Sequence, residues 1–238
     1  MPYVNNKVEE FVNSEMWRKD LELALSNLSA FEDYILEASK ETELGVNFIK
    51  AYLALESLGN HDAVSKKGAT GLGGLMESAA KEVGLKKTRH IDERFDPKSI
   101  IGSARYMRKY IDYFDDVILG LVAYNWGPTR VYDNLDSIKK CDDLIKNRNI
   151  SLESRYYVVH VLARLKIFSD HDSYNLNFER KPLFSSMTNH EHITDKDISI
   201  KHLAKIHKVG EEALKRINPS LIAEIIPKGT VVKIPHKT

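Results

Sequence analysis

Two short, almost uninterrupted apolar stretches constrain the fold of this chain more than any other feature. Residues 48–55 read Phe-Ile-Lys-Ala-Tyr-Leu-Ala-Leu, and residues 117–123 read Val-Ile-Leu-Gly-Leu-Val-Ala. Both are far shorter than the roughly 20 apolar residues that cross a bilayer. A helix that is apolar on nearly every side must be buried on every side. We therefore expect a mainly α fold in which other helices enclose these two.

Helical patterns fill most of the chain ahead of its C-terminal part. Apolar residues recur at three- and four-residue steps over residues 8–39, and Gly45 is suited to a helix stop. A later helix is expected to begin with Asp96 as N-cap and Pro97 at its first position, and another to cover about 152–168. The apolar stripe of the helix after Pro97 comprises Ile100, Ala104, Met107, Ile111 and Phe114.

The character of the sequence changes after Lys181-Pro182. The segment 183–199 is polar and has no helical period. The elements expected beyond it are a strand near 191–194, short helices at 200–208 and 211–217, and a β-branched strand at 229–235. These predict a small βααβ module, and we place the domain boundary between 1–180 and 181–238. A chain of 238 residues accommodates one large domain and such a module.

Composition excludes some classes of partner. Lys and Arg number 35 against 34 Asp and Glu, so a net charge of +1 argues against nucleic acid or an anionic membrane as the partner. The first six residues lack the basic and apolar parts of a signal peptide. The chain is then either cytoplasmic or begins after a removed export signal. The single Cys141 allows no internal disulfide and no Cys-based metal site, and we expect no role for it.

Polar residues end both apolar helices, as Glu56-Ser57 and as Tyr124-Asn125. The segment 59–74 follows the first of them and holds five of the twelve glycines. Long irregular segments are often functional. If both helix ends meet this segment, they form a cleft in which apolar surroundings raise the pKa of Glu56 and the Tyr124 hydroxyl orients it. Such a carboxyl is suited to be a glycosidic general acid, and an ion-paired surface glutamate is the alternative.

Three motifs resemble those of the lysozyme-like lytic transglycosylases. They are Ala-Leu-Glu-Ser at 54–57 with Ala-Val-Ser at 63–65 and Gly-Ala-Thr-Gly-Leu at 68–72, Ala-Tyr-Asn-Trp-Gly at 123–127, and Glu-Ser-Arg-Tyr-Tyr-Val-Val-His-Val-Leu-Ala at 153–163. The segments 84–89 and 92–97, together with the tail containing Asn-Pro-Ser-Leu at 218–221, are similar to the membrane-bound lytic murein transglycosylase D group. The resemblance covers nearly the whole chain.

This resemblance implies a lysozyme-like catalytic (SLT) domain with an N-terminal helical extension over 1–180 and a degenerate LysM-like module over 181–238. It implies cleavage of the β-1,4 bond between N-acetylmuramic acid and N-acetylglucosamine without water, with Glu56 as general acid and then base. Substrate-assisted glycosidases of this kind need no second carboxylate. The residues implied to line the sugar cleft or support the acid are Ser57, Ser65, Met76, Tyr124, Asn125, Glu153 and Tyr157.

The resemblance also implies partners and a place in the cell. The partner is a peptidoglycan glycan strand, no cofactor is needed, and the location is the periplasm or cell envelope. An export signal or N-terminal anchor is then expected to be missing from this chain. His190 and His192 are a weak metal candidate, and we expect no metal. Trp126 is expected either to stack on sugar or to pack in the core.

This chain departs from the family pattern at three positions of the first motif. Gly59 stands at the family's aromatic position, His61 at its proline and Gly74 at its glutamine. The glutamine side chain would hydrogen-bond sugar, and Gly74 adds backbone freedom. These departures keep open the alternative of a catalytically impaired protein that binds peptidoglycan or acts as a scaffold. The basic cluster 86–90 is expected to be a solvated face or a contact for acidic stem peptides.

Overall fold

The computed structural model describes residues 2–139 and 144–236. The helices of the first part are α1 (Pro2–Asn13), α2 (Glu15–Ser29), α3 (Glu32–Thr42), α4 (Val46–Ser57), α5 (Glu77–Glu82), α6 (Ser99–Phe114), α7 (Val117–Trp126), α8 (Pro128–Asp133), α9 (Leu135–Lys139), the 3-10 turn η1 (Leu144–Lys146) and α10 (Leu152–Ser169). The last part contains η2 (Ser185–Met187), β1 (Thr188–Ile193), β2 (Ile198–Ser199), α11 (Ile200–His207), α12 (Glu211–Ile217), β3 (Ile225–Ile226) and β4 (Val231–Pro235). Cys141 lies outside the described residues.

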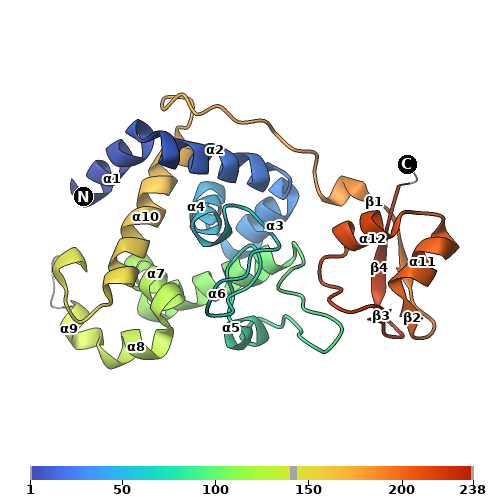
Figure 1. Ribbon diagram of the computed structural model, residues 1–238. Coiled ribbons are helices and arrows are strands. Elements are labelled where there is room, and N and C mark those ends of the chain that lie inside the picture. The colour runs from blue at the N-terminus through green and yellow to red at the C-terminus, as the bar shows by residue number, and fades with distance from the viewer. Residues whose placement is uncertain (1, 140–143, 237–238) are drawn as a thin grey trace.

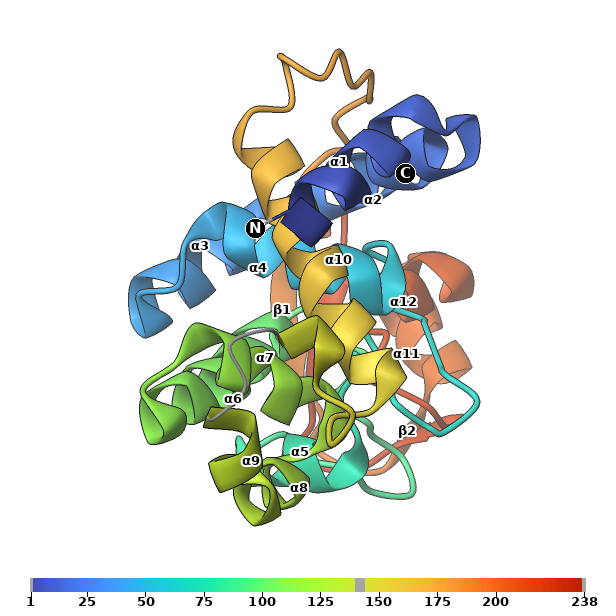
Figure 2. The ribbon, with the colours of Figure 1, turned by 90° about the vertical axis from the view of Figure 1, so that its left-hand side faces the viewer.

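The apolar helix α4 lies at the centre of the helical part, as its composition predicts. Ala51, Tyr52 and Leu53 are fully buried. Helices α2, α3 and α10 pack around it; α10 stands beside α4 in Figure 1 and passes in front of it in Figure 2. The second apolar helix, α7, packs against α6 and α10. The expected mainly α fold with a small strand-containing module is confirmed.

Helix α6 meets α7 through a close contact at Gly120. The expected apolar stripe of α6 is confirmed, because all five of its residues are buried. A Cβ atom on Gly120 would lie 2.4 Å from Cγ1 of Ile111 and 3.0 Å from its backbone nitrogen. Only glycine therefore allows the two helices to approach this closely.

Two helix boundaries predicted from the sequence are wrong. Helix α3 ends at Thr42, because Glu43 adopts the left-handed conformation with φ 57°, and Gly45 is the N-cap of α4 instead of a stop. Helix α6 begins at Ser99, not after Asp96. The Asp96 carboxylate accepts a hydrogen bond from the Lys98 N–H at 2.9 Å, which fixes a turn ahead of the helix.

The C-terminal module has the predicted order of strand, two helices and strand. Strand β1 pairs antiparallel with β4, and β2 and β3 add a second short pair. A separate apolar core forms inside it, with Leu203, Leu214 and Ile226 fully buried. The boundary at residue 180 stays a prediction, since Ile217 of α12 packs with the larger core of the helical part.

The connection after α10 runs along α2 toward the module (Figure 1). The Arg18 guanidinium donates to the Asn175 carbonyl at 2.7 Å, and the Ser26 hydroxyl donates to the Glu179 carbonyl at 2.7 Å. The connection is thus fixed to the helical part by side-chain hydrogen bonds. Among the helices of the described ranges, none has the length and apolar content needed to cross a membrane.

The contact at Gly120 gives a test of this packing. Gly120→Ser adds a Cβ where Ile111 leaves no room, so we expect the free energy of unfolding to fall by about 1–3 kcal/mol. Gly45→Ser is the matched control, because nothing lies within 4 Å of its Cβ position and serine is favoured at an N-cap. Urea unfolding of both variants measures the difference. Equal stability of the two would contradict the packing described.

Candidate active site

The last turn of α4 carries Glu56 and Ser57 to the glycine-rich segment, as expected. This segment folds back on itself through short bridges that pair Thr70 with both Val64 and Leu75. The Ser57 hydroxyl donates to the Leu72 carbonyl at 2.9 Å and so fixes the segment to the end of α4. We call residues 68–75 the glycine loop.

The backbone of the glycine loop lies directly against the Glu56 carboxyl. Gly74 has φ +58°, and a Cβ there would lie 2.3 Å from Oε2 and 3.0 Å from Cδ of Glu56. Any side chain at this position displaces the carboxyl and strains the backbone as well. The departure from the family glutamine at Gly74 therefore accompanies a close approach of the loop to Glu56.

The end of α7 contacts the other half of the loop. The Tyr124 hydroxyl donates its single proton to the Gly73 carbonyl at 2.5 Å. The expectation that this hydroxyl orients Glu56 directly is therefore wrong. A Cβ on Gly73 would lie 2.4 Å from Cβ of Ser103 on α6. Ser103 in turn lies 3.0 Å from the Tyr52 hydroxyl. Tyr124 thus acts on Glu56 through the position of the loop.

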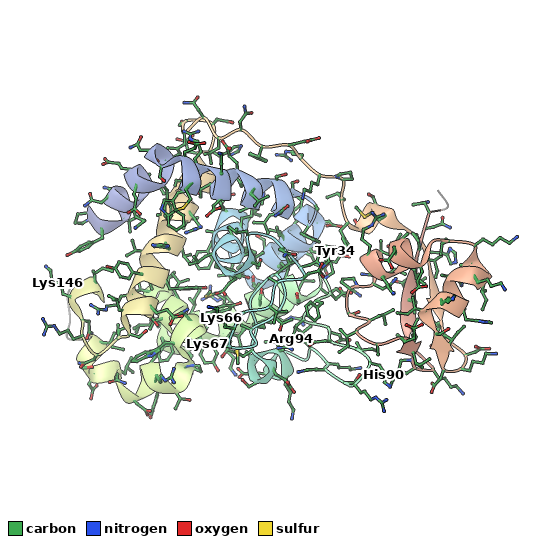
Figure 3. The ribbon with its side chains drawn as sticks, in the orientation of Figure 1. Tyr34, Lys66, Lys67, His90, Arg94 and Lys146 are labelled. Carbon is green, nitrogen blue, oxygen red and sulfur yellow. The ribbon has the colours of Figure 1, made fainter. Side chains whose placement is uncertain are left out.

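Helix α10 brings Tyr157 and Glu153 to the same place. Tyr157 is buried with its hydroxyl near Glu56, but the geometry of that hydroxyl is not that of a hydrogen bond. The two side chains are therefore polar neighbours that are not hydrogen-bonded. The Glu153 side chain is 69% exposed and lies 3.4 Å from Nζ of Lys67, which Figure 3 labels.

The ends of α7 and α10 are also joined to each other. The Ser154 hydroxyl donates to Oδ1 of Asn125 at 2.7 Å. Residues from all three sequence motifs therefore meet around the end of α4.

Burial dominates the electrostatics of Glu56. The pKa of the Glu56 carboxyl is about 7, and burial is the largest cause of this increase. The Tyr157 hydroxyl lowers the pKa, and the negative charge of Glu153 raises it. Burial also raises the pKa of Tyr124 and of Tyr157 well above 10, so both hydroxyls keep their protons at every physiological pH. Near neutral pH, Glu56 can therefore both give and accept a proton.

The other predicted site residues lie in more open places. Ser65 is exposed, and its hydroxyl accepts the Ala69 N–H at 3.0 Å. Met76 is 44% exposed directly before α5. Trp126 is partly buried and packs against the core, so its indole is at least in part a packing residue.

The histidines of β1 have a neighbour that the sequence did not suggest. The rings of His190 and His192 lie 5.3 and 4.8 Å from that of His207 on α11. Within residues 2–139 and 144–236, no three His, Cys, Asp or Glu side chains are placed to hold a metal ion.

Sequence reasoning also missed the buried ion pair of Asp92 and Arg94. Their side chains are 4% and 6% exposed and approach to 2.6 Å. The stretch Asp-Glu-Arg reads as a solvated charge run, and nothing in its pattern signals burial.

Comparison with known proteins agrees with this geometry. The Transglycosylase SLT domain family matches residues 33–145, which include Glu56, the glycine loop and Tyr124. The matched segment is less than half of the chain. The transglycosylase of Enterobacteria phage PRD1 is 31% identical over 113 residues, which are 42% of this chain and 40% of the phage protein.

Solved structures show the same lysozyme-like fold. The 70-kDa soluble lytic transglycosylase SLT70 from Escherichia coli matches with a TM-score of 0.51 and 24% identity, over 59% of this chain and 24% of that protein. A complex of the 70-kDa soluble lytic transglycosylase with bulgecin A matches with a TM-score of 0.55 and 21% identity, over 74% and 30%. The chain thus spans less than a third of either solved protein and about two fifths of the phage protein.

The raised pKa of Glu56 makes a prediction about stability. A carboxyl whose pKa is higher in the folded state stabilises the fold below its unfolded pKa of 4.5, and this contribution is lost as the pH rises through about 7. Glu56→Gln does not ionise. As the pH rises from 4 to 8, the free energy of unfolding of Glu56→Gln should therefore increase relative to that of the wild type by up to about 3 kcal/mol.

Denaturant unfolding at the two pH values measures this gain. The control is Glu15→Gln, whose carboxylate is 82% exposed on α2 and should give no comparable change. A stability difference between Glu56→Gln and the wild type that does not vary with pH would show that Glu56 is hydrated.

Proposed function

We propose that this chain is a peptidoglycan lytic transglycosylase with Glu56 as its catalytic residue. The observation that carries the proposal is the Glu56 carboxyl at the end of a buried helix, with a pKa of about 7, inside the segment that matches the SLT domain. A carboxyl of ordinary pKa is ionised at pH 7 and donates protons poorly, whereas this one is about half protonated. The substrate class comes from the family resemblance.

In the proposed reaction, the protonated Glu56 gives its proton to the glycosidic oxygen between N-acetylmuramic acid and N-acetylglucosamine. The bond from that oxygen to C1 of the muramic residue breaks, and the acetamido oxygen of the same residue supports C1. The Glu56 carboxylate then takes the proton of the C6 hydroxyl, whose oxygen closes on C1. The products are a 1,6-anhydromuramoyl end and a free N-acetylglucosamine hydroxyl, with Glu56 again protonated.

One group can serve both steps because its pKa lies near the working pH. The neighbouring carboxylate, Glu153, is 69% exposed and lies 3.4 Å from the Lys67 ammonium, so it is paired in the manner of a surface residue. This supports a mechanism in which the substrate's acetamido group does the work that a second carboxylate does in most glycosidases.

The remaining predicted residues take supporting roles in this proposal. Tyr157 keeps a neutral hydroxyl next to Glu56, and Tyr124 holds the glycine loop. Ser57 and Asn125 have their side chains engaged with the chain itself, so we assign them to positioning the cleft walls. Ser65, Met76 and Glu153 are exposed and are proposed to contact the glycan strand.

The finer assignment also rests on the resemblance. We propose that 1–180 is the transglycosylase domain with an N-terminal helical extension, and that 181–238 is a degenerate LysM-like module of the lytic murein transglycosylase D type. The expected place of action is the periplasm or cell envelope, where the glycan strands are.

Analysis of reaction products tests the proposal. Sacculi digested with the wild-type chain should release muropeptides with 1,6-anhydro ends, detected by mass spectrometry as species lighter by one water than hydrolysis products. Glu56→Gln should lower the rate by at least about a hundredfold, because a general acid contributes roughly that much or more. Glu15→Gln, which alters an exposed glutamate at the first position of α2, is the matched control and should retain the rate.

Two results would contradict the proposal. Reducing ends that carry water would indicate a hydrolase. Binding to insoluble peptidoglycan without soluble products, equal in the wild type and Glu56→Gln, would indicate the impaired binding protein that the loss of the family glutamine at Gly74 suggests.

A further inference from the structure

The segment 86–97 lies between the glycine loop and the C-terminal module. Figure 3 labels two of its residues, Arg94 near the loop and His90 toward the module. The proposed chemistry uses no residue of this segment, including the buried ion pair of Asp92 and Arg94. Its contacts on both sides nevertheless form a continuous connection to Glu56.

The buried Arg94 guanidinium joins the two ends of the glycine loop. Its Nη1 donates to the Gly68 carbonyl at 3.1 Å and to the Leu75 carbonyl at 3.2 Å. Its Nε and Nη2 donate to the Asp92 carboxylate at 2.9 and 2.6 Å, which fixes the plane of the guanidinium. One side chain thus holds the residues at either end of the loop that covers Glu56.

The backbone of Arg94 also supports the middle of the loop. A Cβ on Gly71 would lie 1.8 Å from the Arg94 carbonyl oxygen, so the two backbones are in direct contact. Gly71 in turn donates its N–H to the Ala63 carbonyl at 2.9 Å. Arg94 therefore contacts the loop at three places, with its backbone at Gly71 and with its guanidinium at the Gly68 and Leu75 carbonyls.

The C-terminal module contacts the same segment from the other side. The Asp92 N–H donates to the Ser220 carbonyl at 2.8 Å, and the Ile222 N–H donates to the His90 carbonyl at 3.0 Å. Beyond Arg94, Nζ of Lys233 on β4 lies 3.3 Å from the Asp96 carboxylate, with side chains only 14% and 16% exposed. Module contacts therefore fix the segment on both sides of Arg94.

We propose that Arg94 is a positioning residue for Glu56, which it serves by holding the glycine loop, and that the C-terminal module is the outer support of the segment that carries Arg94. The module is then part of the active-site architecture and not only an appended unit. The role given to Glu56 rests on the proposed function, whereas the ordering of the glycine loop by Arg94 does not. The proposed function and the role of Arg94 can therefore fail separately.

Hydrogen exchange of the loop amides is the direct test. Arg94→Lys keeps the positive charge beside Asp92, but an ammonium lacks the planar fork that reaches two carbonyls and a carboxylate together. The N–H groups of Thr70, Gly74 and Leu75 are hydrogen-bonded within the loop. We expect their exchange to become at least tenfold faster in Arg94→Lys, measured by mass spectrometry of the peptide that covers the loop.

The matched control is Arg105→Lys, which alters another arginine paired with a carboxylate, Glu41, at an exposed place on α6. Loop exchange in this control should equal that of the wild type. If Arg94→Lys lowers the melting temperature but leaves loop exchange at the wild-type rate, Arg94 serves general stability and the proposal is overturned.

A second pair of variants tests the module and does not depend on the folding of Arg94→Lys. Ile222→Pro removes the N–H that bonds to His90, and the preceding Leu221 forms a β-bridge with Ile91, which suits a residue before proline. Ile222→Ala keeps the N–H. We expect Ile222→Pro, but not Ile222→Ala, to show faster amide hydrogen exchange in residues 86–97 and in the glycine loop. Equal loop exchange in the two variants would overturn the role of the module.

The pH dependence of activity supplies a readout that a merely structural role does not change. The ionisable groups that face Glu56 are Tyr157 and Glu153 from α10, Tyr124 from α7 and Tyr52 from α4. None of these groups is hydrogen-bonded to Arg94 itself, whereas hydration through a loosened loop lowers the pKa of Glu56. Arg94→Lys should therefore move the alkaline limb of kcat/KM to lower pH, and an unmoved limb would count against positioning.

If the wild type releases no anhydro products, the proposed function fails. The exchange experiments still decide the positioning role, because they need no activity.

Discussion

The contact between the Gly74 backbone and the Glu56 carboxyl is the interaction on which the rest of the site depends. The loop backbone covers part of a carboxyl that stands at the end of a buried helix, and burial is the main cause of the raised pKa. The contact requires a loop without side chains at positions 73 and 74. It also requires that loop to be held from outside, by Tyr124 at one carbonyl and by Arg94 at both ends.

The sequence singled out the candidate site residues but not the contacts that hold them in place. The two apolar helices and their polar ends indicated a cleft if both ends met the glycine-rich segment, and the structure brings Glu56 and Tyr124 to that segment. The partner of the Tyr124 hydroxyl and the burial of Arg94 depend on contacts between distant segments, and no local pattern encodes those. The predicted helix boundaries at Gly45 and Asp96 are wrong because Gly45 caps the start of the next helix and Asp96 fixes a turn ahead of α6.

The departure at Gly74 has a different meaning once the structure is known. Taken from the sequence alone, it removes a side chain that would bond sugar and so favours an impaired protein. In the structure, the position is occupied by the carboxyl itself, and any side chain there would push Glu56 aside. Glycine at position 74 therefore allows the loop to pack closely on the Glu56 carboxyl. The contacts of the C-terminal module with segment 86–97 belong to the same arrangement.

Direct titration of the Glu56 carboxyl is the measurement that tests this account most closely. The carboxyl carbon of 13C-labelled glutamate is followed by NMR between pH 3 and pH 9, and the Glu56 resonance is identified by its absence in Glu56→Gln. We expect a midpoint at about pH 7, well above the 4.5 of an ordinary glutamate. A midpoint near 4.5 would mean that the glycine loop does not keep water from the carboxyl, and the central claim would be wrong.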